Sequence, residues 1–186
     1  MIVFMGVAGA GKSVQGKLLA RDLGFQWIST GEILRANLSG NRKKELLSGK
    51  LAGDEELIDL MDKVLGRKDG CKKCILDGFP RTLSQAEWLF AQHEDKRCSI
   101  EALIWMDASE EVVKKRLLSR GRQDDNSVAI TNRFEEYKKS TVPIITSFRN
   151  RGVAIVKVDA EQSVEAVHQD ILSKTVYIVT GKQQTN

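Results

Sequence analysis

The feature that most constrains the fold of this chain is a glycine-rich loop near its start. Residues 6–13 read GVAGAGKS and fit the pattern G-x-x-x-x-G-K-S/T. The glycines let the backbone turn so that successive N–H groups face an anion, and the lysine reaches the phosphates of a nucleotide. An apolar run precedes the loop and a helical pattern follows it, which is the context this motif requires. The pattern therefore predicts a nucleoside triphosphate site. The residues expected to contact the triphosphate are Gly9, Ala10, Gly11, Lys12, Ser13 and Val14.

Apolar runs alternate with longer amphipathic stretches along the rest of the chain. The runs are Ile2–Val7, Gln26–Ser29, Cys74–Phe79, Ala102–Asp107 and Val153–Val158. They are almost continuously apolar, which is typical of strands buried on both faces of a parallel sheet. Helical patterns cover Ser13–Leu23, Leu83–Gln92, Glu110–Ser119 and Ser163–Lys174. This alternation predicts a doubly wound α/β domain whose ligands bind at the carboxyl ends of the strands.

Two intervals interrupt the alternation. Residues 31–73 are helical and polar without a strand, and residues 120–126 form a short charged loop between helices. Both intervals follow the end of a strand or helix, where lobes that cover a substrate would be inserted. We therefore predict one domain over residues 1–186, with a core of residues 1–30, 74–119 and 127–181, a binding lobe of residues 31–73, and a lid stub of residues 120–126.

The composition favours a protein that binds a small anion. The net charge is +4 and the pI is about 9.0, but lysine and arginine are scattered, so we expect no nucleic-acid partner. No run of 18 apolar residues is present, and we expect no membrane span. Three cysteines, Cys71, Cys74 and Cys98, do not make a disulfide framework. Although Cys71 and Cys74 have the spacing of half a zinc site, we interpret them as structural, and we expect a monomer in the reducing cytoplasm.

Acidic residues at strand ends are candidates for holding magnesium near the loop. Asp77 ends one apolar run, and Arg81 follows it closely, which favours a functional role. We interpret Asp107, just before Ser109 and a helical pattern, as a helix cap. Several arginines also lie beside the special segments, and their forked side chains suit phosphate oxygens. These arginines are Arg35, Arg81, Arg116, Arg120, Arg122 and Arg133.

Four segments together resemble the adenylate kinases, in the order found in that family. They are residues 6–15, residues 29–35 (STGEILR), residues 77–82 (DGFPRT) with Gln85, and residues 122–126 (RQDDN). The resemblance extends from Met1 to about Leu172. It implies a P-loop three-layer α/β/α fold with a five-stranded parallel sheet, a helical monophosphate-binding lobe and a very short lid. It also implies Mg²⁺-dependent phosphoryl transfer from ATP to AMP, which yields two ADP.

The resemblance assigns roles to individual residues. Lys12 and the loop amides would hold the ATP phosphates, and Arg116 would lie on the ATP adenine. Arg120, Arg122 and Arg133 would converge on the transferring phosphoryl group. The remaining roles involve AMP, magnesium and arginine orientation. The residues that would bind AMP are Thr30, Gly31, Arg35, Gly78, Arg81 and Gln85. Asp77 would hold Mg²⁺ through water, and Asp124 and Asp125 would orient the arginines. Ser13 is a further candidate contact for Mg²⁺, on the general pattern of such loops and not on the resemblance.

Two residues bear on the choice of acceptor base. Adenine-selective members of the family carry threonine at the position of Thr30 and glutamine at that of Gln85, as this chain does. A glutamine amide offers both a donor and an acceptor to the adenine edge. AMP is therefore the favoured acceptor. A kinase of UMP or CMP, or a nucleotide-binding module with weak turnover, remains an alternative.

The chain also departs from the family pattern. Relatives usually have glycine at the position of Ser13 and threonine at that of Val14. Here only Gly121 separates Arg120 from Arg122, where relatives carry several residues. Because a lid excludes water from the reacting groups, we expect the short lid to seal the site less well.

Overall fold

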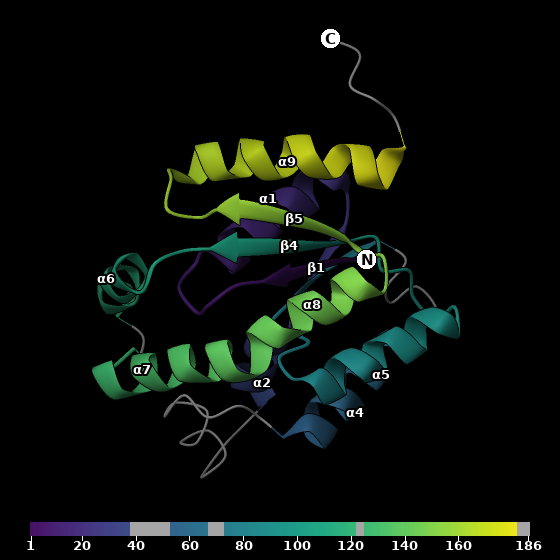
Figure 1. The fold of residues 1–186 in the computed structure, drawn as a ribbon, viewed down its shortest axis with the longest axis horizontal. Coiled ribbons are helices and arrows are strands. Elements are labelled where there is room, and N and C mark those ends of the chain that lie inside the picture. The colour runs from purple at the N-terminus through teal and green to yellow at the C-terminus, as the bar shows by residue number, and fades with distance from the viewer. Residues whose placement is uncertain (38–52, 67–72, 122–124, 182–186) are drawn as a thin grey trace.

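The computed structural model describes residues 1–37, 53–66, 73–121 and 125–181. In these residues one parallel sheet of five strands lies between two helical layers (Figure 1), as the sequence predicts. The strand order is β2-β3-β1-β4-β5. The strands are β1 (Ile2–Met5), β2 (Gln26–Ser29), β3 (Cys74–Asp77), β4 (Ala102–Asp107) and β5 (Ala154–Asp159).

The helices form a layer on each face of the sheet. Helices α1 and α9 cover one face, and α5 and α8 cover the other, with α4 packed against α5 (Figure 1). Helix α6 lies beyond the carboxyl end of β4. The helical segments are α1 (Lys12–Leu23), α2 (Thr30–Asn37), α4 (Asp54–Leu65), α5 (Leu83–Glu94), α6 (Glu110–Arg120), α7 (Ser127–Glu136), the π-helical turn η1 (Tyr137–Thr141), α8 (Val142–Asn150) and α9 (Val164–Thr180).

Apolar side chains on the two faces of the sheet form two core clusters. Leu19 of α1 and Ile171 of α9 pack with strand residues on one face. On the other face, Leu57 and Met61 of α4 join the same cluster as Leu76 of β3. Helix α4, which lies within the predicted binding lobe, therefore packs onto the core of the sheet.

Two strands end earlier than the apolar runs that predicted them. Strand β1 ends at Met5 and β3 ends at Asp77. Gly6 and Gly78 follow these strands with φ of 152° and 90°, so the backbone leaves the sheet there. Val7 and Phe79 are nevertheless buried, with 3% and 1% of their surfaces exposed. The apolar runs extend past the ends of the strands because apolar residues indicate burial, whatever the local backbone structure. Val7 and Phe79 are as buried as the strand residues before them.

Pairing of the central strands brings three loops together. Phe4 of β1 pairs with Asp77 of β3, and Met5 of β1 pairs with Trp105 of β4. The segments that follow β1, β3 and β4 therefore leave the sheet at one edge, on either side of the strand that carries the glycine-rich loop. Such a point in an open α/β sheet is where ligands collect.

Within the described ranges, no helix combines the length and the apolar character needed to cross a membrane.

Candidate functional site

The carboxyl edge of the sheet opens into a cavity of about 520 Å³. Among the site residues expected from the sequence, those that line the cavity are Gly9, Ala10, Gly11, Lys12, Ser13, Val14, Thr30, Gly31, Arg35, Asp77, Gly78, Arg81, Arg116, Arg120 and Arg133. Gln85 is not part of this lining. Arg122 and Asp124 lie outside the described residues.

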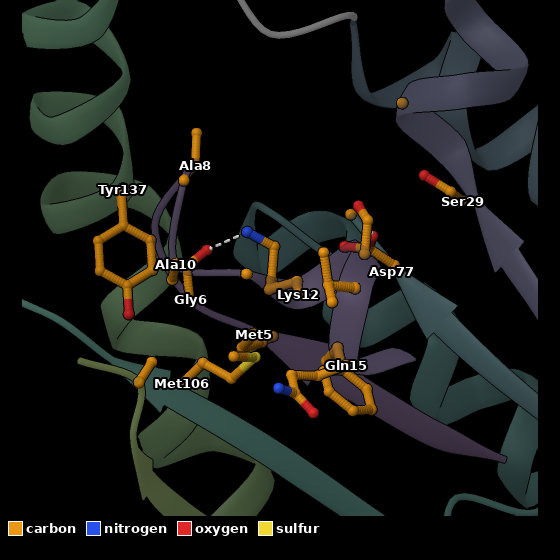
Figure 2. Close-up of a pocket in the computed structure, with 18 of the residues that line it drawn as sticks. Met5, Gly6, Ala8, Ala10, Lys12, Gln15, Ser29, Asp77, Met106 and Tyr137 are labelled. Atoms are coloured by element: carbon orange, nitrogen blue, oxygen red, sulfur yellow. Dashed lines mark hydrogen bonds between the residues drawn. The ribbon is translucent and has the colours of Figure 1, made fainter. Parts of the chain in front are cut away.

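The glycine-rich loop leaves β1 and returns to begin α1. Gly9 and Gly11 have φ of 91° and 94°, a region that favours glycine. A Cβ atom on Gly9 would lie 2.8 Å from Cγ of Leu117, so the loop also packs closely against α6. The Lys12 Nζ donates hydrogen bonds to the carbonyl oxygens of Gly6, at 2.7 Å, and Val7, at 2.9 Å. Figure 2 shows Lys12 reaching over the loop, with Tyr137 to one side and Asp77 to the other.

The cavity is electrostatically prepared for an anion. The pKa of Lys12 is lowered from 10.5 to about 8, chiefly by burial and also by the charges of Arg81, Arg120 and Arg133, although Asp77 opposes them. Burial also lowers the pKa of Arg81, but a guanidinium stays protonated in proteins. Several cations thus share a space with restricted solvation, and a phosphate group would relieve their repulsion.

Ser13 and Asp77 meet between the loop and β3. The Ser13 Oγ donates to the Asp77 Oδ2 at 2.7 Å, and Asp77 is 4% exposed. Hydroxyl and carboxylate oxygens are hard ligands that suit Mg²⁺, which typically takes its other ligands from phosphates and water. In the described parts of the chain, no group of three or more His, Cys, Asp or Glu side chains able to hold a metal occurs. The pair fits a magnesium ion that arrives with a nucleotide.

A second set of residues lines the cavity on the far side of Asp77. The Arg81 Nε donates to the Gly78 carbonyl at 2.8 Å. The Thr30 hydroxyl donates a longer hydrogen bond, of 3.4 Å, to the Asp77 carbonyl oxygen. Arg35, in the last turn of α2, also lines the cavity, and its charge lowers the pKa of Arg81. Two arginines therefore approach one anion-binding region that is separate from the glycine-rich loop.

Gln85 lies behind this region, fully buried at 0% exposure. Its Oε1 accepts the backbone N–H of Arg81 at 2.8 Å, and its Nε2 donates to the Asp54 Oδ1 at 2.8 Å. The same Asp54 oxygen accepts from the Thr82 hydroxyl at 2.9 Å. Gln85 therefore links α5 to the first residue of α4 and to the backbone of a cavity arginine.

Arginines from α6 and α7 meet at a buried carboxylate. The Arg120 guanidinium donates from Nε and Nη2 to the two Asp125 oxygens at 2.7 and 2.6 Å. The Arg133 Nη1 donates to the Asp125 Oδ1 at 3.3 Å. The Asp125 side chain is 1% exposed. This contact fixes both guanidinium groups at the cavity wall.

Two further residues expected from the sequence lie at the β4–β5 side. Arg116 lines the cavity, and its Nη1 donates to the Ala160 carbonyl at 2.7 Å. The expectation that Asp107 caps a helix is wrong. The side chain of Ser109 caps α6, whereas the Asp107 carboxylate pairs with the Lys157 Nζ at 2.8 Å, because β4 and β5 place residues 107 and 157 close together.

Sequence reasoning missed the cavity residues that follow Arg133. Glu136, Tyr137 and Thr141 also line the cavity. Glu136 and Tyr137 lie three and four residues after Arg133, which is the spacing of one helical face, and Thr141 lies eight residues after it. That spacing was the available signal, but it carries no motif that distinguishes a site from a core helix. The Tyr137 hydroxyl accepts from the Trp105 Nε1 at 3.0 Å, and burial raises the pKa of Tyr137.

Comparison with known proteins places this geometry in a family. The family model described as adenylate kinase matches residues 4–153. A protein named adenylate kinase from Corynebacterium urealyticum is 38% identical over 177 residues, which cover 92% of this chain and 96% of that protein. One of the same name from a Synechococcus species is 36% identical over 172 residues, covering 89% of this chain and 93% of that protein. With this match and the cavity described above, the chain belongs to the adenylate kinase family.

Proposed function

We propose that this chain catalyses the reversible, Mg²⁺-dependent transfer of the γ-phosphoryl group of ATP to AMP, which yields two ADP. The observation that carries the proposal is the joining of two anion-binding regions in one cavity. The glycine-rich loop with Lys12 forms one region, Arg35 and Arg81 form the other, and Arg120 and Arg133 reach the wall between α6 and α7. A donor and an acceptor nucleotide can therefore meet with their phosphates together.

In this mechanism the residues act by positioning and by neutralising charge. Lys12 exchanges its carbonyl partners for the donor phosphates, and Arg116 lies against the donor base. Arg35 and Arg81 hold the acceptor phosphate. Arg120 and Arg133, with Arg122, neutralise the charge of the group in transfer. Transfer is in line and forms no covalent intermediate with the protein.

The acceptor base would be read by Thr30 and Gln85. The amide of Gln85 keeps one N–H and one lone pair beyond its contacts with Asp54 and Arg81. These groups would pair with the adenine edge. Because Gln85 is fully buried, the surrounding chain must shift when AMP binds.

Magnesium would be held by Ser13 and Asp77, with the nucleotide phosphates as further ligands. The ion would supply positive charge that offsets the negative charge of the phosphates. Replacing Ser13 with alanine removes the hydroxyl that contacts Asp77, so the Mg²⁺ concentration for half-maximal activity should rise about threefold or more. Ser13→Thr keeps the hydroxyl and is the matched control. An unchanged Mg²⁺ requirement in Ser13→Ala would remove Ser13 from the metal site.

The test of the function is a steady-state assay of ADP formation from ATP and Mg²⁺ with AMP, CMP, UMP, GMP or no acceptor. Strong stimulation by AMP alone is the expected result. Stimulation by a pyrimidine monophosphate would keep the mechanism and overturn the proposed base choice. Tight ATP binding without transfer to any monophosphate would indicate a nucleotide-binding module. A monomer in the cytoplasm is part of the proposal and rests on the composition.

A further inference from the structure

Thr141 lines the cavity and contacts Arg81, although no sequence motif includes it. It is the last residue of the π-helical turn η1, and 8% of its surface is exposed. Its Oγ1 donates a hydrogen bond to the carbonyl oxygen of Arg81 at 3.1 Å. The two residues come from separate elements, since Arg81 follows β3 and Thr141 precedes α8. The contact therefore joins the acceptor arginine to the helical run of α7, η1 and α8.

The π-helical turn explains why Thr141 faces the cavity. The Val142 N–H donates to the Tyr137 carbonyl, five residues earlier. In an unbroken α-helix, residue 141 would lie about 80° around the axis from residue 133. A π turn holds about one residue more than an α turn, which cancels most of that offset. Arg133 and Thr141 consequently share one face of the run, and both line the cavity.

Thr141 completes a set of contacts that fixes Arg81 from three directions. The backbone N–H of Arg81 donates to the Gln85 Oε1 at 2.8 Å, and its side-chain Nε donates to the Gly78 carbonyl at 2.8 Å. The Thr141 hydroxyl donates to the other polar backbone group of Arg81, its carbonyl oxygen. Hydrogen bonds thus hold the backbone N–H, the backbone carbonyl and the side-chain Nε of Arg81.

We infer that Thr141 is a positioning residue that holds Arg81 ready for the phosphate of the acceptor monophosphate. The inference rests on the proposed function, in which Arg81 binds that phosphate. Through the π turn, Thr141 also keeps Arg81 in register with Arg133, which lies on the same helical run. Thr141 itself does not touch the reacting atoms. Its effect should appear in acceptor affinity and leave donor affinity unchanged.

The expected effect is modest because one neutral hydrogen bond is lost. Thr141→Val keeps the shape of the side chain and removes the donor. The KM for AMP and the dissociation constant for AMP should rise about threefold to tenfold, while the KM for ATP stays unchanged. Thr141→Ser keeps the hydroxyl and should restore values close to the wild type. Thr141→Ala also lacks the donor and has no branched side chain. It should weaken AMP binding to a similar extent, and it provides the test if Thr141→Val folds poorly.

Thr175 provides a matched control. Like Thr141, it is a buried threonine whose hydroxyl donates to a backbone carbonyl, here that of Ile171 in its own helix α9, but it does not line the cavity. Thr175→Val should change the melting temperature without changing either KM. If the effect of Thr141→Val merely followed a loss of stability, Thr175→Val would show it too, and the KM values of ATP and AMP would both change.

Steady-state kinetics for both substrates, calorimetric titration with AMP alone and thermal melting together decide the question. The inference is overturned if Thr141→Val and Thr141→Ala leave AMP affinity unchanged, if they weaken ATP and AMP binding equally, or if Thr141→Ser does not bind AMP with an affinity close to that of the wild type. A wild type that binds AMP but transfers no phosphoryl group refutes the proposed function, while the titration still tests Thr141. A wild type that does not bind AMP overturns both.

Discussion

Two cavity residues, Lys12 and Gly78, have contacts that bear directly on phosphate binding. In the structure Lys12 contacts the carbonyl oxygens of Gly6 and Val7, and burial, together with the cations around it, lowers its pKa. Gly78 occupies a narrow space between Thr30 and Arg81. These two residues give the sharpest predictions at this scale.

The lowered pKa of Lys12 predicts a pH dependence of ATP binding. Since the phosphates need the charged ammonium, ATP affinity of the free protein should fall as the pH rises through about 8, by up to about tenfold per pH unit. The stability of the ligand-free protein moves the other way. Between pH 8 and 10.5 the unfolded chain binds the proton that the folded chain has lost, so the contribution of Lys12 to the free energy of unfolding rises with pH.

Calorimetric titration with ATP from pH 7 to pH 9.5 measures this dependence. Lys12→Arg is the control, because its guanidinium does not titrate in this range. The arginine variant is expected to bind ATP more weakly, with affinity that does not depend on pH. A wild-type profile that is flat through pH 8 would contradict the prediction.

Substitution of Gly78 should damage the acceptor side. Gly78 has φ of 90°, and a Cβ atom there would lie 2.7 Å from the Thr30 Oγ1 and 3.1 Å from the Arg81 Nη2. Gly78→Ala should lower kcat/KM for AMP about tenfold or more, because both neighbours must move. Gly24 has φ of 65° with no atom within 4 Å of such a Cβ. Gly24→Ala should therefore cost about 1 kcal/mol of stability and leave kinetics intact. Equal kinetics in the two variants would refute the steric argument.

At the scale of elements, the sequence predicts the sheet and the loop well because each has a local cause. The five strands read as apolar runs, and the loop reads as a glycine pattern. The π turn at residues 137–141 has no such local signal. It lies between α7, which packs on α6, and α8, which packs on α5 and β5. The packing of α4 on the core depends on Leu57 and Met61 meeting residues of distant strands.

The carboxylate of Asp125 joins the elements α6 and α7 and should be costly to neutralise. Asp125→Asn leaves two arginines without their shared anion at a site where the aspartate is 1% exposed. Since Arg120 is 33% exposed and therefore partly screened, the loss in stability should be about 2–3 kcal/mol. The misplaced guanidinium groups should lower kcat by about tenfold or more.

Chemical denaturation and steady-state kinetics measure both effects of Asp125→Asn. Asp170 is a suitable control, because it pairs with Lys174 at 2.8 Å on the exposed side of α9. Asp170→Asn should cost less than about 0.5 kcal/mol and leave kcat unchanged. A kcat for Asp125→Asn equal to the wild-type value would show that Asp125 does not orient the arginines for catalysis.

At the scale of the whole molecule, closure must exclude water from two nucleotides. Helix α6 ends at Arg120, Gly121 follows with φ of 66°, and α7 begins at Ser127. Such a short connection offers little chain to cover the cavity. ATP hydrolysis without AMP should therefore be measurable beside the transfer reaction. A coupled assay of ADP formation from ATP and Mg²⁺ alone tests this, with AMP added as the reference. Negligible hydrolysis would show that the short lid seals the site.

The central place of β1 in the sheet has a consequence for synthesis on the ribosome. Strand β1 and the glycine-rich loop emerge before β3 and β4, but these later strands are the neighbours of β1 in the sheet, where Ile2 meets Ile75 and Ala102. Until those strands emerge, both edges of an apolar strand are unpaired and open to aggregation. We therefore expect ATP to add little to the stability of the nascent chain before β3 and β4, which flank the strand that carries the loop, have been made.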